Sequence, residues 1–150
     1  MRKGIVIHSH TGNTLHVASE ISGVLTSVVE KVEAENEDPN STDPIVLTRN
    51  PSVEHYDFIV FGAPVRGFSL SPVMKKYLEG LDLTNKTIFC FVTQHLKSPM
   101  FGGNRAVKQM KKLCESKGGE VMDVAVVNWS SNKKDELIKD IIIKLSKNNV

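Results

Sequence analysis

Residues 4–14 read GIVIHSHTGNT and join a short apolar run to a segment of helical spacing. The run at 4–8 is typical of a buried parallel strand. Further along, apolar residues recur every three to four positions, at Leu15, Val17, Ala18, Ile21 and Leu25. The hydroxyl-rich segment 9–14 is therefore expected at a strand-to-helix turn.

The composition of segment 9–14 predicts a phosphate-binding site. The first N–H groups of a helix lack intrahelical partners and the helix dipole adds positive potential, so an anion is favoured there. The candidate ligands are hydroxyls, an amide, a glycine that admits close approach and a backbone N–H, from Ser9, Thr11, Thr14, Asn13, Gly12 and His10. The alternative is that the hydroxyls only cap the helix. Neither a nucleoside triphosphate loop nor G-x-G-x-x-G is present.

Length and composition indicate one globular domain of 150 residues, with 40% hydrophobic and 24% charged residues. No run approaches the length of a secretory or membrane-spanning segment, so a cytoplasmic protein without a membrane span is expected. Cys90 and Cys114 are expected to be reduced and buried, and the scattered histidines predict no metal site.

Charge is unevenly distributed along the chain. Residues 1–74 carry five Lys or Arg against nine Asp or Glu, and residues 75–150 carry fourteen against eight. Four cations, Arg105, Lys108, Lys111 and Lys112, would share the outer face of one helix, where they could steer an acidic partner or nucleic acid. The favoured alternative is that they only form a solvated face. No aromatic residues interleave with them to stack on bases, so nucleic acid is not an expected partner.

The remaining chain alternates apolar strand-like runs with helical spacing. Strands are expected near 28–32, 56–62, 87–93 and 121–127, with a short apolar island at 45–47. Helices are expected at 13–26, from Ser71-Pro72 to Gly80, at 105–117, and after a cap at Ser131 or Asn132. This alternation predicts an α/β fold, a doubly wound five-stranded parallel sheet of order 2-1-3-4-5.

In such a sheet, ligands bind at the carboxyl ends of the strands where the strand order reverses. The loops predicted at 9–14, 62–72 and 93–104 all leave carboxyl ends of inner strands. They are expected to converge on one crevice.

The pattern S-x-T-G-N-T at 9–14 resembles the phosphate-binding signature of flavodoxins, and the order of the three loops is similar to that family over essentially the whole chain. The resemblance implies FMN as the cofactor. In the second loop it gives Arg66 the place of the residue stacked on the flavin and Gly67 the place of the glycine whose peptide faces flavin N5. The other positions that match the two later loops are Pro64, Val65, Phe68, Thr93, Gln94, His95, Phe101, Gly102 and Gly103.

Two features depart from the family. Arg66 and Phe68 stand where flavodoxins carry an aromatic residue or Met and an acid, and a guanidinium near the flavin should favour its reduced anion. The outer stacking residue is not evident, and the candidates are Phe101, Phe68, His95 and Trp129.

The resemblance implies an electron carrier that shuttles electrons between redox partner proteins. One alternative is a flavodoxin-like reductase or oxidase acting on a quinone or on protoporphyrinogen. Another is a flavin-free interaction module that keeps the fold. The length favours the carrier, because 150 residues leave no second domain for a nicotinamide or a second flavin.

Overall fold

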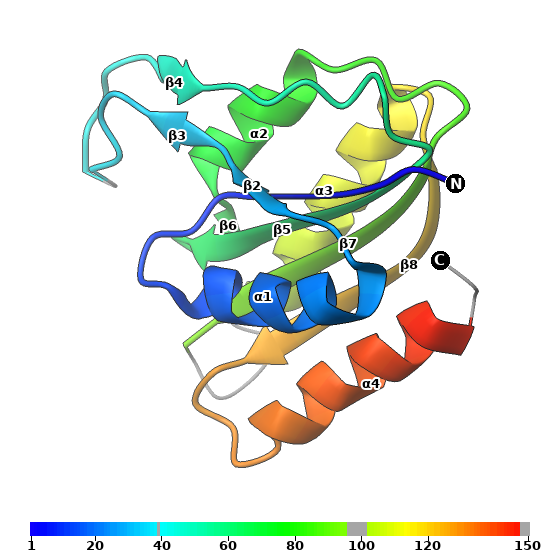
Figure 1. The fold of residues 1–150 in the computed structure, drawn as a ribbon. Helices are drawn as coiled ribbons and strands as arrows, with labels where there is room; N and C mark the ends of the chain where they lie inside the picture. The colour runs from blue at the N-terminus through cyan, green and yellow to red at the C-terminus, as the bar shows by residue number, and fades with distance from the viewer. Residues whose placement is uncertain (39, 96–101, 148–150) are drawn as a thin grey trace.

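The computed structural model describes residues 1–38, 40–95 and 102–147. At its centre lies a parallel sheet of order β2-β1-β5-β7-β8 (Figure 1). The strands are β1 (Lys3–Ile7), β2 (Val29–Lys31), β5 (Phe58–Arg66), β7 (Thr87–Gln94) and β8 (Glu120–Asn128). With these five strands numbered along the chain, the order is 2-1-3-4-5, so the predicted α/β doubly wound sheet is confirmed.

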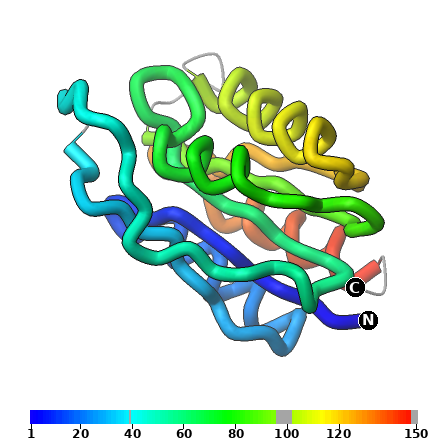
Figure 2. The backbone as a smooth tube through the Cα atoms, turned by 90° about the horizontal axis from the view of Figure 1, so that it is seen from above, coloured from blue at the N-terminus to red at the C-terminus, as the bar shows by residue number. Residues whose placement is uncertain are grey.

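Helices cover both faces of the sheet. Those in the described residues are α1 (Asn13–Leu25), α2 (Pro72–Glu79), α3 (Gly103–Ser116) and α4 (Lys134–Lys147). Helices α1 and α4 lie on one face and α2 and α3 on the other (Figure 2). In β5, Ile59 and Phe61 enter the core under α2 and α3, whereas Phe58 and Val60 enter the core under α1 and α4. Because side chains alternate along a strand, this all-apolar run marks a strand covered on both faces.

The connection from β2 to β5 differs from the prediction that strands alternate with helices throughout. Its described residues form no helix, and β3 (Glu33–Ala34) instead pairs antiparallel with β4 (Leu47–Arg49). The predicted strand at 45–47 corresponds to β4, which begins at Leu47. The polar, proline-containing stretch between β3 and β4 has no apolar stripe that a packed helix would need.

Strand β5 is longer than predicted. Residues 63–66, expected in a loop, continue the strand, which turns at Gly67 and Phe68 into β6 (Ser69–Leu70). Pro64 led to the wrong prediction, because proline is rare in central strands. It is tolerated because β1 pairs only as far as Gly62, so Pro64 has a ladder partner only in β7.

The other predicted elements match closely. Helix α2 has Ser71 as its N-cap, with Ser71 Oγ accepting a hydrogen bond from the Met74 N–H at 3.3 Å, and Pro72 is its first residue, as predicted. Helix α3 begins at Gly103, two residues earlier than expected. The closing helix begins at Lys134, later than a cap at Ser131 or Asn132 implies.

Both cysteines are buried free thiols, as predicted. A hydrogen bond with Cys114 raises the pKa of the Cys90 thiol well above its ordinary value, and burial raises it further. Over the described ranges, no helix has the length and apolar character needed to cross a bilayer.

A pair of glycine substitutions tests the packing between β5 and β7. A Cβ at Gly62 would lie 2.2 Å from a ring carbon of Phe91, its ladder partner, whereas a Cβ at Gly23 in α1 meets no described atom within 4 Å. Gly62→Ala is therefore expected to lower the free energy of unfolding by about 1–3 kcal/mol through overpacking. Gly23→Ala, the control, is expected to raise it by about 0.5–1 kcal/mol. Urea denaturation measures both, and an unchanged stability of Gly62→Ala would contradict this packing.

Candidate functional site

The carboxyl ends of β1, β5 and β7 meet at a cavity of about 240 Å³. All three predicted segments contribute to its wall. The lining residues are His10, Thr11, Asn13, Pro64, Val65, Arg66, Thr93, Gln94 and His95. We call this the switch-point cavity, because the strand order reverses between β1 and β5, and such reversals are where α/β sheets bind ligands.

The N-terminus of α1 borders the switch-point cavity. Its N-cap residue is Gly12, at φ 95°, which has no side chain to cap the helix. Ser9 Oγ accepts a hydrogen bond from the backbone N–H of Leu15, with 3.4 Å between nitrogen and oxygen, at the limit of a hydrogen bond. One hydroxyl of segment 9–14 therefore reaches the first turn of α1, but only by a long contact. The helix end keeps the unpaired donors and positive potential that favour an anion.

Two side-chain contacts join the start of α1 to the end of β7. The Asn13 amide nitrogen lies 3.2 Å from Nε2 of His95, and the hydroxyls of Thr14 and Thr93 lie 2.8 Å apart. Thr14 and Thr93 are buried, whereas Thr11 is exposed. The Thr14 hydroxyl thus holds the α1 turn against β7, and Thr11 presents the hydroxyl that solvent can reach.

The predicted residues of segment 9–14 are not all on one wall. Ser9 and Gly12 line a second cavity of about 240 Å³, toward β2 and Glu37. His10 lines both this cavity and the switch-point cavity, so the two adjoin. Segment 9–14 therefore separates two cavities at the end of α1.

The turn between β5 and β6 has a positive φ at both central residues, 56° at Gly67 and 63° at Phe68. Positive φ angles at both central residues are characteristic of a type I′ hairpin turn, which normally has Asn, Asp or Gly at these positions. A Cβ at Gly67 would have no described atom within 4 Å, so open space lies on that side of the residue. Phe68 is 56% exposed despite its size.

The third segment is described as far as His95 and again from Gly102. Gly102 and Gly103 are buried at the start of α3, and a Cβ at Gly102 would lie 2.6 Å from Cα of Phe68. The β5–β6 turn therefore rests directly on the start of α3. The predicted site residue Phe101 lies outside the described residues.

Trp129, a candidate for stacking on the flavin, does not line the switch-point cavity. Its ring meets His16 of α1 edge-on, with centroids 5.4 Å apart, and Lys134 Nζ lies 4.5 Å from the ring centroid. The backbone N–H of Trp129 donates a hydrogen bond to the backbone carbonyl of Gln94, at 2.7 Å. Its ring thus packs on the α1 and α4 side of the sheet.

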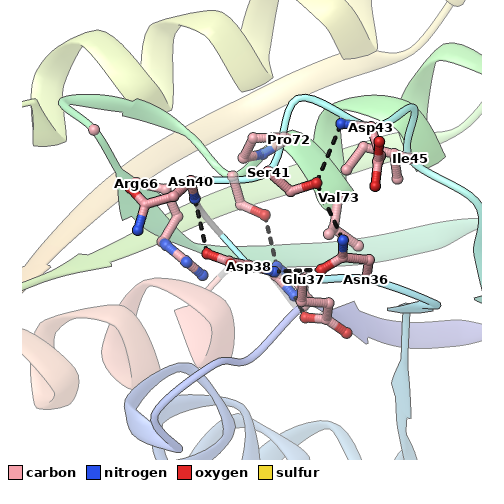
Figure 3. Close-up of a pocket in the computed structure, with 13 residues that line it drawn as sticks. Asn36, Glu37, Asp38, Asn40, Ser41, Asp43, Ile45, Arg66, Pro72 and Val73 are labelled. Carbon is pink, nitrogen blue, oxygen red and sulfur yellow. Dashed lines mark hydrogen bonds and ion pairs between the residues drawn. The ribbon is translucent and has the colours of Figure 1, made fainter.

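A larger cavity, of about 400 Å³, lies on the other side of Arg66 (Figure 3). It is enclosed by the β5–β6 turn, the start of α2 and the segment between β3 and β4. Its lining residues are His8, Asn36, Glu37, Asp38, Asn40, Ser41, Asp43, Ile45, Arg66, Gly67, Ser71, Pro72 and Val73. Arg66 therefore stands between this acidic cavity and the switch-point cavity.

The sequence did not reveal a buried chain of hydrogen bonds at this 400 Å³ cavity. Ser71 Oγ lies 2.6 Å from Nδ1 of His8, and Nε2 of His8 contacts the Glu37 carboxylate. The Ala34 N–H donates to the other Glu37 oxygen at 3.2 Å. A neutral His8 that accepts from Ser71 and donates to Glu37 satisfies every partner. A histidine ending an apolar run was a signal, but its partners are 29 and 63 residues away.

The pKa values of this pair follow from the contacts. Burial lowers the pKa of His8 below its ordinary value of 6.5, although the Glu37 carboxylate acts in the opposite direction. Burial alone would raise the pKa of Glu37, but the hydrogen bonds from His8 and the Ala34 N–H lower it overall. His8 is therefore neutral and Glu37 ionised at neutral pH.

These shifts predict a loss of stability on acidification. The unfolded chain takes up the His8 proton below pH 6.5, before the folded chain does, and Glu37 adds a further loss below pH 4.5. Between pH 7.5 and 5.5, the free energy of unfolding should fall by up to about 1 kcal/mol on account of His8. Denaturation of His8→Gln at both pH values should show a smaller fall. His55→Gln, the exposed control, should behave like the unsubstituted chain, and equal falls in both variants would refute the assignment.

Comparison with known proteins decides the family. The model of the family described as "Flavodoxin domain" matches residues 4–129. This chain belongs to the flavodoxin family. No curated protein sequence matches it.

Solved structures of other flavodoxins share its fold. Oxidised flavodoxin 1 from Bacillus cereus has a TM-score of 0.70 at 18% identity, and 98% of each chain is covered. A flavoprotein from Lactobacillus acidophilus in complex with FMN has a TM-score of 0.64 at 19% identity, covering 91% of this chain and 97% of that one. A WrbA-like flavodoxin from Agrobacterium tumefaciens has a TM-score of 0.74 at 15% identity, covering 98% and 96%.

Proposed function

We propose that this flavodoxin-family chain binds FMN in the switch-point cavity and carries electrons between redox partner proteins. The observation that supports this most is the N-terminus of α1, which has a glycine as its N-cap and borders a cavity walled by segments at the ends of all three inner strands. A phosphate at the helix end and a flat ring between the two later segments would use both features. The FMN complex of the Lactobacillus acidophilus flavoprotein, which has the same fold, supports the choice of cofactor.

The residues present fit the two ends of FMN. The phosphate would be held by the free N–H groups of the first turn of α1, the hydroxyls of Ser9 and Thr11, and the amide of Asn13. The ring would lie against Arg66 on one side and the segment from His95 on the other. Gly67, which the resemblance places at flavin N5, lines the 400 Å³ cavity instead. Thr93 and Gln94 form the end of β7 between them.

FMN, when bound, supplies the capacity to take up and release electrons, and the protein contributes binding, orientation and electrostatics. Among the described residues that line the switch-point cavity, Arg66 contributes the Lys or Arg charge. Gly67 has a positive φ, and a glycine can exchange between positive and negative φ at low steric cost, so its peptide could offer either its N–H or its C=O to the cofactor.

The 400 Å³ cavity beside Glu37 favours one alternative, an enzyme that reduces or oxidises a small molecule directly. This cavity would accommodate part of a substrate such as a quinone, and the fold is shared with a WrbA-like protein. Arg66 and Gly67 separate that space from the proposed ring position. A flavin-free interaction module is the remaining alternative.

Titration with FMN and stepwise reduction separates these functions. We expect bound FMN with a perturbed visible spectrum, and oxidation of NADPH only after a separate reductase is added. Ser9→Ala combined with Thr11→Val should weaken FMN binding about 10- to 100-fold, since each hydroxyl would bond a charged group. Ser19→Ala, on the exposed side of α1, is the control. Turnover of NADPH and a quinone by the isolated holoprotein would favour the enzyme, and absence of FMN binding would favour the interaction module.

The position of Arg66 predicts the redox behaviour of the bound cofactor. Removing its charge should make addition of the second electron less favourable, because a guanidinium stabilises the reduced anion. Arg66→Ala is expected to shift the second midpoint potential to more negative values by an amount on the order of tens of millivolts. Lys139→Ala removes one exposed charge from α4 and should leave the potential unchanged. Equal potentials in Arg66→Ala and the unsubstituted protein would contradict this role.

A further inference from the structure

The cations of α3 and α2 form a positively charged surface that begins beside the switch-point cavity. We call this the basic face and define it as Lys75, Arg105, Lys108 and Lys112, all exposed. Arg105, Lys108 and Lys112 are three and four residues apart, which places them on one side of α3. Lys75 of α2 and Lys112 line the same groove. None of the four forms an ion pair with another described residue.

The charge order along α3 opposes its own dipole. Arg105 lies in the first turn, where the dipole is positive and no acidic residue is present, and Glu115 lies in the last turn, where no basic residue is present. Helix α4 has the favourable order, with Asp135 and Glu136 first and Lys144 and Lys147 last. The order in α3 therefore costs helix stability, and Arg105 adds a positive charge at the start of the helix, the end that contacts Phe68.

An exposed aromatic residue adjoins this positive end. Phe68 is 56% exposed, adopts a positive φ that a bulky residue rarely takes, and contacts the start of α3 through Gly102. Beside the basic face, the groove between α2 and α3 has a volume of about 330 Å³ and contains the side chains of Leu70 and Leu113. An apolar centre with a charged rim is the usual make-up of a protein–protein interface.

We propose that the basic face and Phe68 form the docking surface for an acidic redox partner protein. This rests on the proposed function, because docking here would bring the partner to the edge of the switch-point cavity. Complementary charge would steer the encounter and Phe68 would provide apolar contact close to the cofactor. A protein is favoured over nucleic acid because Phe68 is the only aromatic residue exposed next to the basic face among the described residues, which is too few for a base-stacking surface.

Electron transfer kinetics with reagent proteins of opposite charge test this surface. The probe is a reduced, acidic plant-type [2Fe–2S] ferredoxin, from which one electron passes to the oxidised FMN of the holoprotein. Stopped-flow rate constants for the unsubstituted protein are expected to rise as the ionic strength falls. With an oxidised c-type cytochrome of basic charge, which takes one electron from the reduced FMN of the holoprotein, the rate constant should fall as the ionic strength falls.

Two variants with the same net charge locate the effect. Arg105→Gln/Lys108→Gln/Lys112→Gln should lower the ferredoxin rate constant at low salt roughly tenfold and flatten its salt dependence. The control Lys117→Gln/Lys139→Gln/Lys147→Gln removes three cations outside the basic face and should have a much smaller effect. Equal loss in both variants, or a rate independent of salt, would overturn the docking surface.

Two further measurements distinguish a wrong docking surface from a wrong proposed function and from nucleic-acid binding. Both variants should keep the FMN absorbance of the unsubstituted holoprotein, and a holoprotein that holds no FMN would refute the proposed function instead. Binding of a fluorescent DNA duplex at 0.15 M salt that is lost only in the α3 variant would assign the basic face to nucleic acid and overturn the proposal.

Discussion

The site depends on the unequal lengths of three neighbouring parallel strands. Strand β1 ends at Ile7, opposite Gly62, and Gly62 lies opposite Phe91 in β7. Beyond the row formed by Ile7, Gly62 and Phe91, strand β5 continues to Arg66 and strand β7 continues to Gln94. Strand β5 therefore extends past the end of β1 by roughly 13 Å, and β7 by roughly 10 Å. The sheet therefore has a step at its carboxyl edge, and α1 begins at the base of that step.

This step explains why such different side chains lie around one cavity. Pro64, Val65, Thr93 and Gln94 belong to the extended strand ends, whereas Thr11 and Asn13 belong to the turn below them. The turn cannot move away, because Thr14 is hydrogen-bonded to Thr93 inside the protein. A ligand with an anionic end and a flat apolar end matches this arrangement of a helix terminus and two strand ends.

Much of this fold could be predicted from the sequence, because its signals are local. Apolar runs with β-branched residues located the strands, and helical spacing from Leu15 to Leu25 located α1 within one residue. The length of β5 could not be predicted in this way. Pro64 indicates a loop unless one knows that β1 has already ended, which is a fact of tertiary structure.

The site could be predicted only in part for the same reason. Segment 9–14 carries its own chemical signature, but Glu37 reaches His8 from a polar segment with no recognisable motif. The hydrogen-bonded chain through Ser71 joins residues that only the folded sheet brings together. Likewise, the four cations of α3 were visible in the sequence, whereas the contact between the start of α3 and Phe68 was not.

A crystal structure of the protein with bound FMN tests the central claim most directly, because two cavities compete for the cofactor. We expect the phosphate at the first turn of α1, within hydrogen-bonding distance of the Asn13 and Thr14 N–H groups, with the ring against Arg66 in the switch-point cavity. FMN bound in the 400 Å³ cavity beside Glu37, or a phosphate away from the end of α1, would contradict it.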